Sequence, residues 1–345
     1  MKCKVIIALS LITLSVRGQQ NNENAWTWFY RKLLDNKIIN KHSNEIMFTQ
    51  TDIPHFLQLI FSWNGFRPQK GYYSFWVKVR DAKTKIWSDW YKMSEWGSTI
   101  QRSFHTKTSD GIEFAHVRLE TKKKGVSDAF AIKAHAHGGA CLANLKAFMV
   151  NTSDNSKFKS ELGGNDLNKL GSLRIKNVPI FSQFELDHPR NDGLCSPTSC
   201  SMITSYFIKS LVDPIIFAEK SYDHGLEKYG SWPFNMAHAF ECCKGAWWFA
   251  VVRLQSFSHL CRYLKSGIPV AVSVRGPLPG AFGQYANGHL LVVTGYDAQK
   301  KEVICNDPAA KSKGEVNKRY CLQDFLQSWE KSHRLAYVAD RNKHT

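Results

Sequence analysis

The sequence lacks the features that mark membrane bundles, zinc proteins and nucleotide-binding enzymes. Beyond one apolar run near its start, no stretch approaches the roughly 20 apolar residues that a membrane-spanning helix needs. The nine cysteines and thirteen histidines show no zinc-site spacing, and no GxxxxGK[ST] phosphate-binding loop occurs. There is also no internal repeat. We therefore expect neither a metal nor an organic cofactor.

Acidic residues are scarce relative to basic ones. The chain has 29 Asp and Glu against 46 Lys and Arg, which gives a formal net charge of +17. Such a protein attracts anionic surfaces, including cell-wall polymers, lipid headgroups and nucleic acid. The basic residues are scattered, however, and short clusters such as Lys122–Lys124 are typical of a solvated face. Without an aromatic-basic RNA signature, the charge does not predict a nucleic-acid partner.

The first residues are typical of an export signal. Lys2 and Lys4 begin it, Val5–Val16 form its apolar core, and the small Gly18 suits a cleavage site. The run is too short to span a bilayer, although an uncleaved anchor stays open as the alternative. We expect residues 1–18 to be removed and the protein to be secreted or periplasmic. No cysteine follows this cut, so a lipid anchor is not expected there.

The cysteine count argues against a complete disulfide set. Of nine cysteines, Cys3 leaves with the signal, and if Cys195 is a free thiol an odd number remains. Buried free thiols are the preferred interpretation for most of them. A bridge from Cys261 to Cys242 or Cys243 stays open.

Residues 19–150 show the pattern of an antiparallel β-sandwich. Along 71–80 the apolar residues alternate, which marks one buried face of a strand. Short strand-like runs separated by polar turns recur at 56–63, 114–120 and 129–135. Five tryptophans fall in or beside these runs: Trp63, Trp76, Trp87, Trp90 and Trp96. We expect them to fill the core and its edges, with an exposed sugar platform as the alternative.

The rest of the chain has a different pattern. Residues 151–171 are polar and glycine-rich and predict a linker. Residues 172–345 then mix both element types. Helices are predicted at 197–209 and 257–265, and strands at 269–274, 289–296 and 303–306. The fold class is therefore α+β, with an accessory β domain before a mixed domain.

Cys195 carries the signals of a reactive thiol. It lies in GLCSPTS, where Pro197 suits the first turn of a helix because its φ is fixed and it lacks an N–H. A cysteine at a helix start meets free backbone N–H groups and the positive end of the helix dipole, which favour the thiolate. The thiolate is the nucleophilic form. A small buried apolar residue is the alternative.

His289 is the candidate base for that thiol. It begins GHLLVVTGY at the mouth of a predicted strand, and the next strand returns after a polar turn. A hairpin centred on residue 298 places Asp307 opposite His289, with Cβ atoms about 5 Å apart. A carboxylate there fixes the imidazole tautomer and stabilises its cation. A slip of one residue presents Asn306 instead, so both stay open, with Asp307 favoured.

Gln183, in VPIFSQ, is the candidate for the oxyanion site. Its side-chain amide, together with the backbone N–H of Cys195, would donate to the negative charge that develops on a carbonyl under attack. The alternative is a solvated loop residue.

These residues resemble the C39-like family of papain-type cysteine peptidases, in its secreted bacterial branch. The resemblance covers about 178–340, and WSDWYKMSEWG resembles the β-rich domain that precedes the peptidase domain in that branch. The matching segments are VPIFSQ, GLCSPTSCSMITSY, YGSWPFNMAHA, VVRLQSF, NGHLLVVTGYD, VICNDPAA and FLQSWEKSHRLAYV.

The resemblance implies a helix that carries the nucleophile and packs on an antiparallel sheet that carries the base. It assigns the nucleophile to Cys195, the base to His289, the orienting acid to Asp307 and the oxyanion amide to Gln183. Two departures are Ser196, where the wider family has Gly, and a longer spacer between Gln183 and Cys195. The leader-peptidase role of transporter-fused members is not carried over.

The predicted function is therefore hydrolysis of peptide bonds in a peptide or protein substrate. Two alternatives remain. One is a non-catalytic protein that binds a surface, glycan or peptide, with the β domain contacting cell wall or glycan. The other is an amidase of cell-wall peptides, which would use the same three residues.

Overall fold

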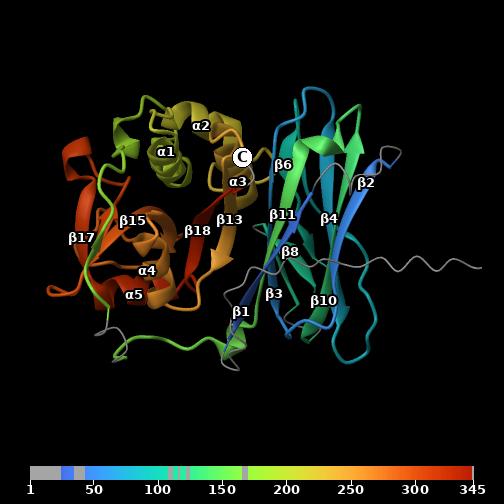
Figure 1. Ribbon diagram of the computed structural model, residues 1–345, viewed down its shortest axis with the longest axis horizontal. Helices are drawn as coiled ribbons and strands as arrows, with labels where there is room; N and C mark the ends of the chain where they lie inside the picture. Colours follow the sequence, from blue (N-terminus) through green and yellow to red (C-terminus); the bar gives the residue numbers. More distant parts are fainter. Residues whose placement is uncertain are drawn as a thin grey trace, which may run out of the picture.

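The computed structural model describes residues 25–34, 43–107, 112–115, 117–121, 125–164 and 170–343. The predicted export signal, residues 1–18, lies outside the described residues, and so do residues 165–169 of the predicted linker. Figure 1 shows an all-β N-terminal half beside a mixed C-terminal half. The described residues contain three antiparallel sheets and five α-helices, so the chain is of mixed α and β class.

The N-terminal half contains two of the sheets. One has six strands in the order β1 (Thr27–Leu33), β11 (Leu145–Ser153), β3 (Gln58–Gly65), β9 (Arg118–Glu120), β8 (Glu113–Ala115) and β7 (Thr106–Lys107). The other has five in the order β2 (Glu45–Gln50), β10 (Ser127–His137), β4 (Tyr72–Asp81), β5 (Tyr91–Gly97) and β6 (Gln101–Ser103). Two 3-10 turns lie beside β11, η1 (Leu142–Asn144) and η2 (Asn155–Lys157).

Alternating side chains bring these two sheets together. Along β4, Tyr73, Phe75, Val77 and Val79 are buried, as the sequence pattern predicts. The ring of Phe75 stacks on Trp63 of β3 in the other sheet, with centroids 4.1 Å apart. Aromatic packing between the two inner faces therefore forms a single hydrophobic core.

The tryptophans divide between this core and the outer face of the five-stranded sheet. Trp63 and Trp96 are fully buried, as expected. Trp87 and Trp90 are partly exposed, and the Lys78 ammonium lies 4.8 and 4.9 Å from their ring centroids. The faces of the Trp87 and Trp90 rings are therefore covered by a lysine cation and are not fully open to solvent.

Two boundaries in this half differ from prediction. The single strand expected at 114–120 is a hairpin of β8 and β9, because Val117 adopts a left-handed φ of +60°. Strand β11 continues to Ser153 because residues 147–153 pair with β1, so the first residues of the predicted linker are sheet.

The C-terminal half is built on one antiparallel sheet. Its strands follow the order β13 (Trp247–Arg253), β18 (Leu335–Arg341), β14 (Val270–Val274), β15 (His289–Asp297), β16 (Glu302–Asn306) and β17 (Asn317–Cys321), and β12 (Leu173–Arg174) pairs with β15. The helices are α1 (Cys195–Ile208), α2 (Pro214–Ser221), α3 (Trp232–Cys242), α4 (Phe257–Lys265) and α5 (Leu322–Glu330). Short 3-10 turns are η4 (Gln183–Glu185), η5 (Asn191–Gly193) and η6 (Lys313–Glu315). In Figure 1, α1 lies on one side of β15, and α4 and α5 lie on the other.

Buried polar contacts join the two halves. The side-chain amide of Asn64 on β3 donates to the carbonyl of Phe249 (2.7 Å) and accepts its N–H (2.8 Å). Phe234 of α3 is fully buried in the core of the N-terminal half, edge-on to Trp63. Helix α3 and strand β13 therefore pack on β3, and the N-terminal half is anchored to the C-terminal half by more than the linker.

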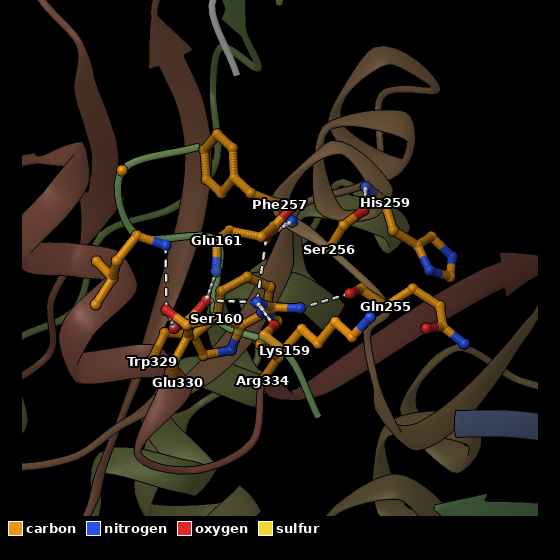
Figure 2. Close-up of polar contacts among 12 residues, drawn as sticks. Lys159, Ser160, Glu161, Gln255, Ser256, Phe257, His259, Trp329, Glu330 and Arg334 are labelled. Carbon is orange, nitrogen blue, oxygen red and sulfur yellow. Dashed lines mark hydrogen bonds and ion pairs between the residues drawn. The ribbon is translucent and has the colours of Figure 1, made fainter. Parts of the chain in front are cut away.

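The described part of the linker is clamped rather than loose (Figure 2). The buried Arg334 forms an ion pair with Glu330 and donates to the carbonyl of Lys159 (2.8 Å). Glu330 in turn accepts the N–H of Glu161 (2.8 Å). The carboxylate of Glu161 accepts the N–H of Phe257 at the start of α4 (2.7 Å). This network fixes the crossing chain against α4 and α5.

Candidate active site

Cys195 lies at the N-terminus of α1, as the sequence predicts. The helix begins at Cys195 itself and has no side-chain cap at Leu194. Among the described residues, neither the N–H of Cys195 nor that of Ser196 donates a hydrogen bond. The thiol is partly exposed. It therefore meets unpaired N–H groups and the positive end of a helix that is 14 residues long.

The contacts of α1 hold the sulfur toward the sheet. Ser199, one turn after Cys195, donates through Oγ to the carbonyl of Leu290 on β15 (3.1 Å). Ser196, the departure from the family pattern, points inward and shares a hydrogen bond with the Tyr337 hydroxyl (3.2 Å). The side chain of Ser196 is buried, so it does not cover the sulfur of Cys195.

His289 is the first residue of β15, beside Leu290. Its Nε2 lies 2.7 Å from Oδ1 of Asp307, and the imidazole is close enough to the sulfur of Cys195 to lower the pKa of that thiol. Since Nε2 is taken by Asp307, Nδ1 is the ring nitrogen left for the sulfur. The structure thus brings Cys195, His289 and Asp307 together in that order.

The contact between His289 and Asp307 does not come from the predicted register. Asn306 pairs with Val292, and Asp297 pairs with Glu302, so the hairpin is centred beyond residue 298. A β-bulge interrupts the pairing between Val293 and Gly295. The predicted direct cross-strand pairing is therefore wrong. Asp307 reaches the imidazole because it follows the end of β16.

Asn306, the open alternative, faces away from the imidazole. Its side-chain amide donates to the carbonyl of Pro179 (3.3 Å), and its oxygen accepts a bond from Asn317 (3.0 Å). Side chains alternate along the chain, so Asp307 points to the opposite side. Asp307 is the residue that contacts His289.

Asp307 is fully buried, and both of its oxygens are satisfied. Oδ1 accepts from His289 and from the N–H of Ala309 (2.9 Å). Oδ2 accepts from the hydroxyls of Tyr285 (2.9 Å) and Tyr320 (2.7 Å). Burial alone would raise the pKa of Asp307, but the charge of His289 and these hydrogen bonds outweigh it and lower the pKa. The carboxylate therefore stays ionised.

The charge of Asp307 shifts the pKa of His289, which in turn shifts the pKa of Cys195. Burial alone would lower the pKa of His289, but the charge and hydrogen bond of Asp307, with that of Cys195, raise it to about 10. Burial alone would raise the pKa of Cys195, yet the hydrogen bond and charge of His289, and a hydrogen bond from the backbone of Leu290, lower it. The two shifts favour a thiolate–imidazolium pair at neutral pH.

Gln183 is buried near this group, but its amide is already engaged. Its Nε2 donates to the carbonyls of Asn191 (2.9 Å) and Asp192 (3.0 Å), in the turn before α1. Its backbone N–H donates to Pro308 (2.8 Å), the neighbour of Asp307. The amide therefore ties the loop before Cys195 to the acid side of the site. It would have to release one of these carbonyls to serve an oxyanion.

The other cysteines are in different environments. Cys200, Cys243, Cys261 and Cys305 are buried free thiols, and no bridge joins Cys261 to Cys242 or Cys243. Burial raises the pKa of Cys242, Cys243 and Cys261 to about 12. Among the cysteines with a shifted pKa in the described residues, only that of Cys195 moves downward.

With this geometry in place, comparison with known proteins finds a family that the C-terminal half resembles. Residues 175–337 match the model of the Peptidase_C39 like family. Over this segment the chain is similar to that family. The match contains all four residues of the predicted site, and the resemblance found in the sequence is confirmed. The C39-like segment, residues 175–337, begins directly after β12 and ends within β18.

Two further comparisons complete the picture. Among solved structures, xylellain, a cysteine protease from Xylella fastidiosa, matches with 14% sequence identity and a TM-score of 0.33. The match covers 53% of this chain and 91% of that one. No curated protein matches. Within the described residues, no helix is long and apolar enough to cross a membrane.

Sequence reasoning missed the two tyrosines that hold Asp307. Tyr320 occupies the inward position of an otherwise exposed strand, β17, so its burial pattern gives a weak signal. Tyr285 lies in a glycine-rich loop with no periodicity, and nothing in the sequence points to it.

Proposed function

We propose that the C39-like segment is a cysteine peptidase that hydrolyses peptide bonds, with Cys195 as nucleophile, His289 as base and acid, and Asp307 as the orienting carboxylate. One observation carries the proposal: the His289 imidazole, whose Nε2 lies 2.7 Å from the buried Asp307 carboxylate, is close enough to Cys195 at the start of α1 to lower the pKa of its thiol. The match to a peptidase family supports a peptide or protein as substrate.

The chemistry follows from the protonation states at the site. The Cys195 thiolate attacks the amide carbonyl, and the carbonyl oxygen becomes an oxyanion. The unpaired N–H of Cys195 donates to that oxygen, and Gln183 joins it if it releases one backbone carbonyl. His289 then gives its proton to the leaving amine, which breaks the C–N bond. Water, deprotonated by His289, attacks the thioester and releases the acid and the thiol.

Asp307 acts through His289 in this scheme. Its hydrogen bond to Nε2 holds the ring with Nδ1 toward the sulfur and stabilises the cation that forms. Asp307 therefore affects Cys195 only through the orientation and charge of the His289 imidazole.

The function is tested by a substrate-profiling digest. Wild-type protein is incubated with a peptide library and, separately, with muropeptides, which distinguishes a peptidase from a cell-wall amidase. We expect cleavage in the peptide pool, which Cys195→Ala abolishes and Cys141→Ala, at an exposed cysteine far from the site in sequence, leaves intact. Cleavage that survives Cys195→Ala would disprove the assignment, and release from muropeptides alone would favour the amidase.

The remaining proposals concern the ends of the chain and its first half. We propose that the protein is exported and begins at Gln19 after cleavage, which the intact mass of the exported protein tests. The β-rich half, which we interpret as a β-sandwich accessory domain, packs on α3 and β13. Its contact with cell wall or glycan stays a prediction, which cosedimentation with cell-wall polymer checks.

A further inference from the structure

Tyr285 lies face-on to the imidazole of His289. The ring centroids are 4.1 Å apart and the planes differ by 16°. The tyrosine comes from the loop between β14 and β15, four residues before the histidine. Because Asp307 is hydrogen-bonded to the edge of the imidazole, the stacked Tyr285 ring closes one of its two faces. An imidazole held at an edge and on a face has little freedom to rotate about its side-chain bonds.

The loop backbone adopts an unusual conformation to place this ring. Tyr285 has a φ of +48°, a left-handed conformation that costs an aromatic residue on the order of 1 kcal/mol or more. Its carbonyl accepts the N–H groups of Gly276 (3.0 Å) and Gly288 (2.9 Å), which pin it from both sides. Strain that is held in this way beside a reactive group is typical of a functional position.

The hydroxyl of Tyr285 makes a second contact with the site. It donates to Oδ2 of Asp307 (2.9 Å), so the residue touches the base with its ring and the acid with its hydroxyl. Tyr320 donates to the same oxygen (2.7 Å) from the protein core. The Tyr320 ring makes no contact with His289. A Tyr320 variant therefore shows the effect of losing a hydroxyl donor to Asp307 without losing a ring on His289.

We propose that Tyr285 is a positioning residue whose ring holds the His289 imidazole beside the Cys195 sulfur. The inference rests on the proposed function and adds a residue to it. Without the ring, the imidazole can swing away from the sulfur, and the Cys195 thiol then loses the charge that favours its ionised form. The ring is therefore the part of Tyr285 that matters most.

The test is the pH dependence of iodoacetamide alkylation at Cys195, followed by mass spectrometry of the peptide that contains it. Tyr285→Ala should move the midpoint upward by about one pH unit, a tenfold loss of thiolate, since an aromatic contact is worth about a factor of ten. Tyr285→Phe keeps the ring and should shift the midpoint far less. Tyr320→Phe, the matched control, should resemble Tyr285→Phe. Tyr285→Leu repeats the test if the alanine variant does not fold.

Each outcome decides the matter. An unchanged midpoint in Tyr285→Ala or Tyr285→Leu would overturn the proposal, and so would a shift in Tyr285→Phe as large as in Tyr285→Ala. Peptide hydrolysis is measured on the same variants. If wild-type protein hydrolyses nothing while the alkylation shifts appear, the proposed function fails and the positioning role of Tyr285 stands.

Discussion

Replacing Arg334 should destabilise the protein far more than replacing an exposed arginine. Arg334 is 1% exposed and pairs with the buried Glu330 (Figure 2). Its guanidinium also lies 4.6 Å from the ring centroid of Phe158. Arg334→Met keeps the apolar stem but leaves the Glu330 carboxylate buried without its cation. Breaking a buried pair in this way costs about 3–5 kcal/mol. At about 2–4 °C per kcal/mol, the melting temperature should fall by about 10 °C.

Arg319→Met is the matched control. Arg319 also pairs with two carboxylates, Asp297 (3.2 Å) and Glu302 (3.1 Å), but its side chain is 46% exposed. Exposed pairs contribute about 1 kcal/mol or less. Urea unfolding followed by tryptophan fluorescence gives both values, and limited proteolysis of 158–164 reports release of the linker. If the two variants lose the same stability, the reasoning about the buried clamp is wrong.

Three further predictions concern the site and the contact between the halves. Hydrolysis measured against pH should be bell-shaped, rising as Cys195 ionises and falling near pH 10 as His289 loses its proton. Asp307→Asn should move the falling limb to lower pH, because the charge of the carboxylate then no longer raises the pKa of His289 against the effect of burial; a falling limb still near pH 10 would contradict this. The raised pKa of His289 stabilises the fold fully below about pH 6.5, and unfolding from pH 6 to 11 should show this contribution lost through pH 10. Asn64→Ala should cost about 1–3 kcal/mol in urea unfolding, because it leaves the buried backbone groups of Phe249 unpaired; an unchanged midpoint would contradict it.

Local sequence signals predicted the parts of the fold that local physics determines. The helix at 257–265 has the predicted bounds, and β4 follows the predicted alternation because one face is buried. The start of α1 at Cys195 lies two residues before the predicted one, since Pro197 occupies the third rather than the first helical position.

The sequence-based predictions that failed concern features that depend on contacts between residues distant in sequence. The hairpin register could not be read because the turn after Asp297 is centred beyond residue 298, and a β-bulge at 293–295 then shifts the pairing once more. The two bonds from Gln183 to backbone carbonyls depend on a turn at 191–193 that no motif marks. Tyr285 joins the site through a left-handed backbone held by two glycines, a tertiary arrangement that periodicity does not report.

The most direct test of the central claim is to trap the acyl-accepting thiol with an electrophilic peptide, such as a peptidyl vinyl sulfone, and map the adduct by mass spectrometry. The account predicts one adduct, on Cys195, formed quickly in wild-type protein and at least about a hundredfold more slowly in His289→Ala, since a base of this kind contributes about two orders of magnitude. An adduct formed first on an exposed cysteine such as Cys141 or Cys321, or one on Cys195 at an undiminished rate in His289→Ala, would contradict it.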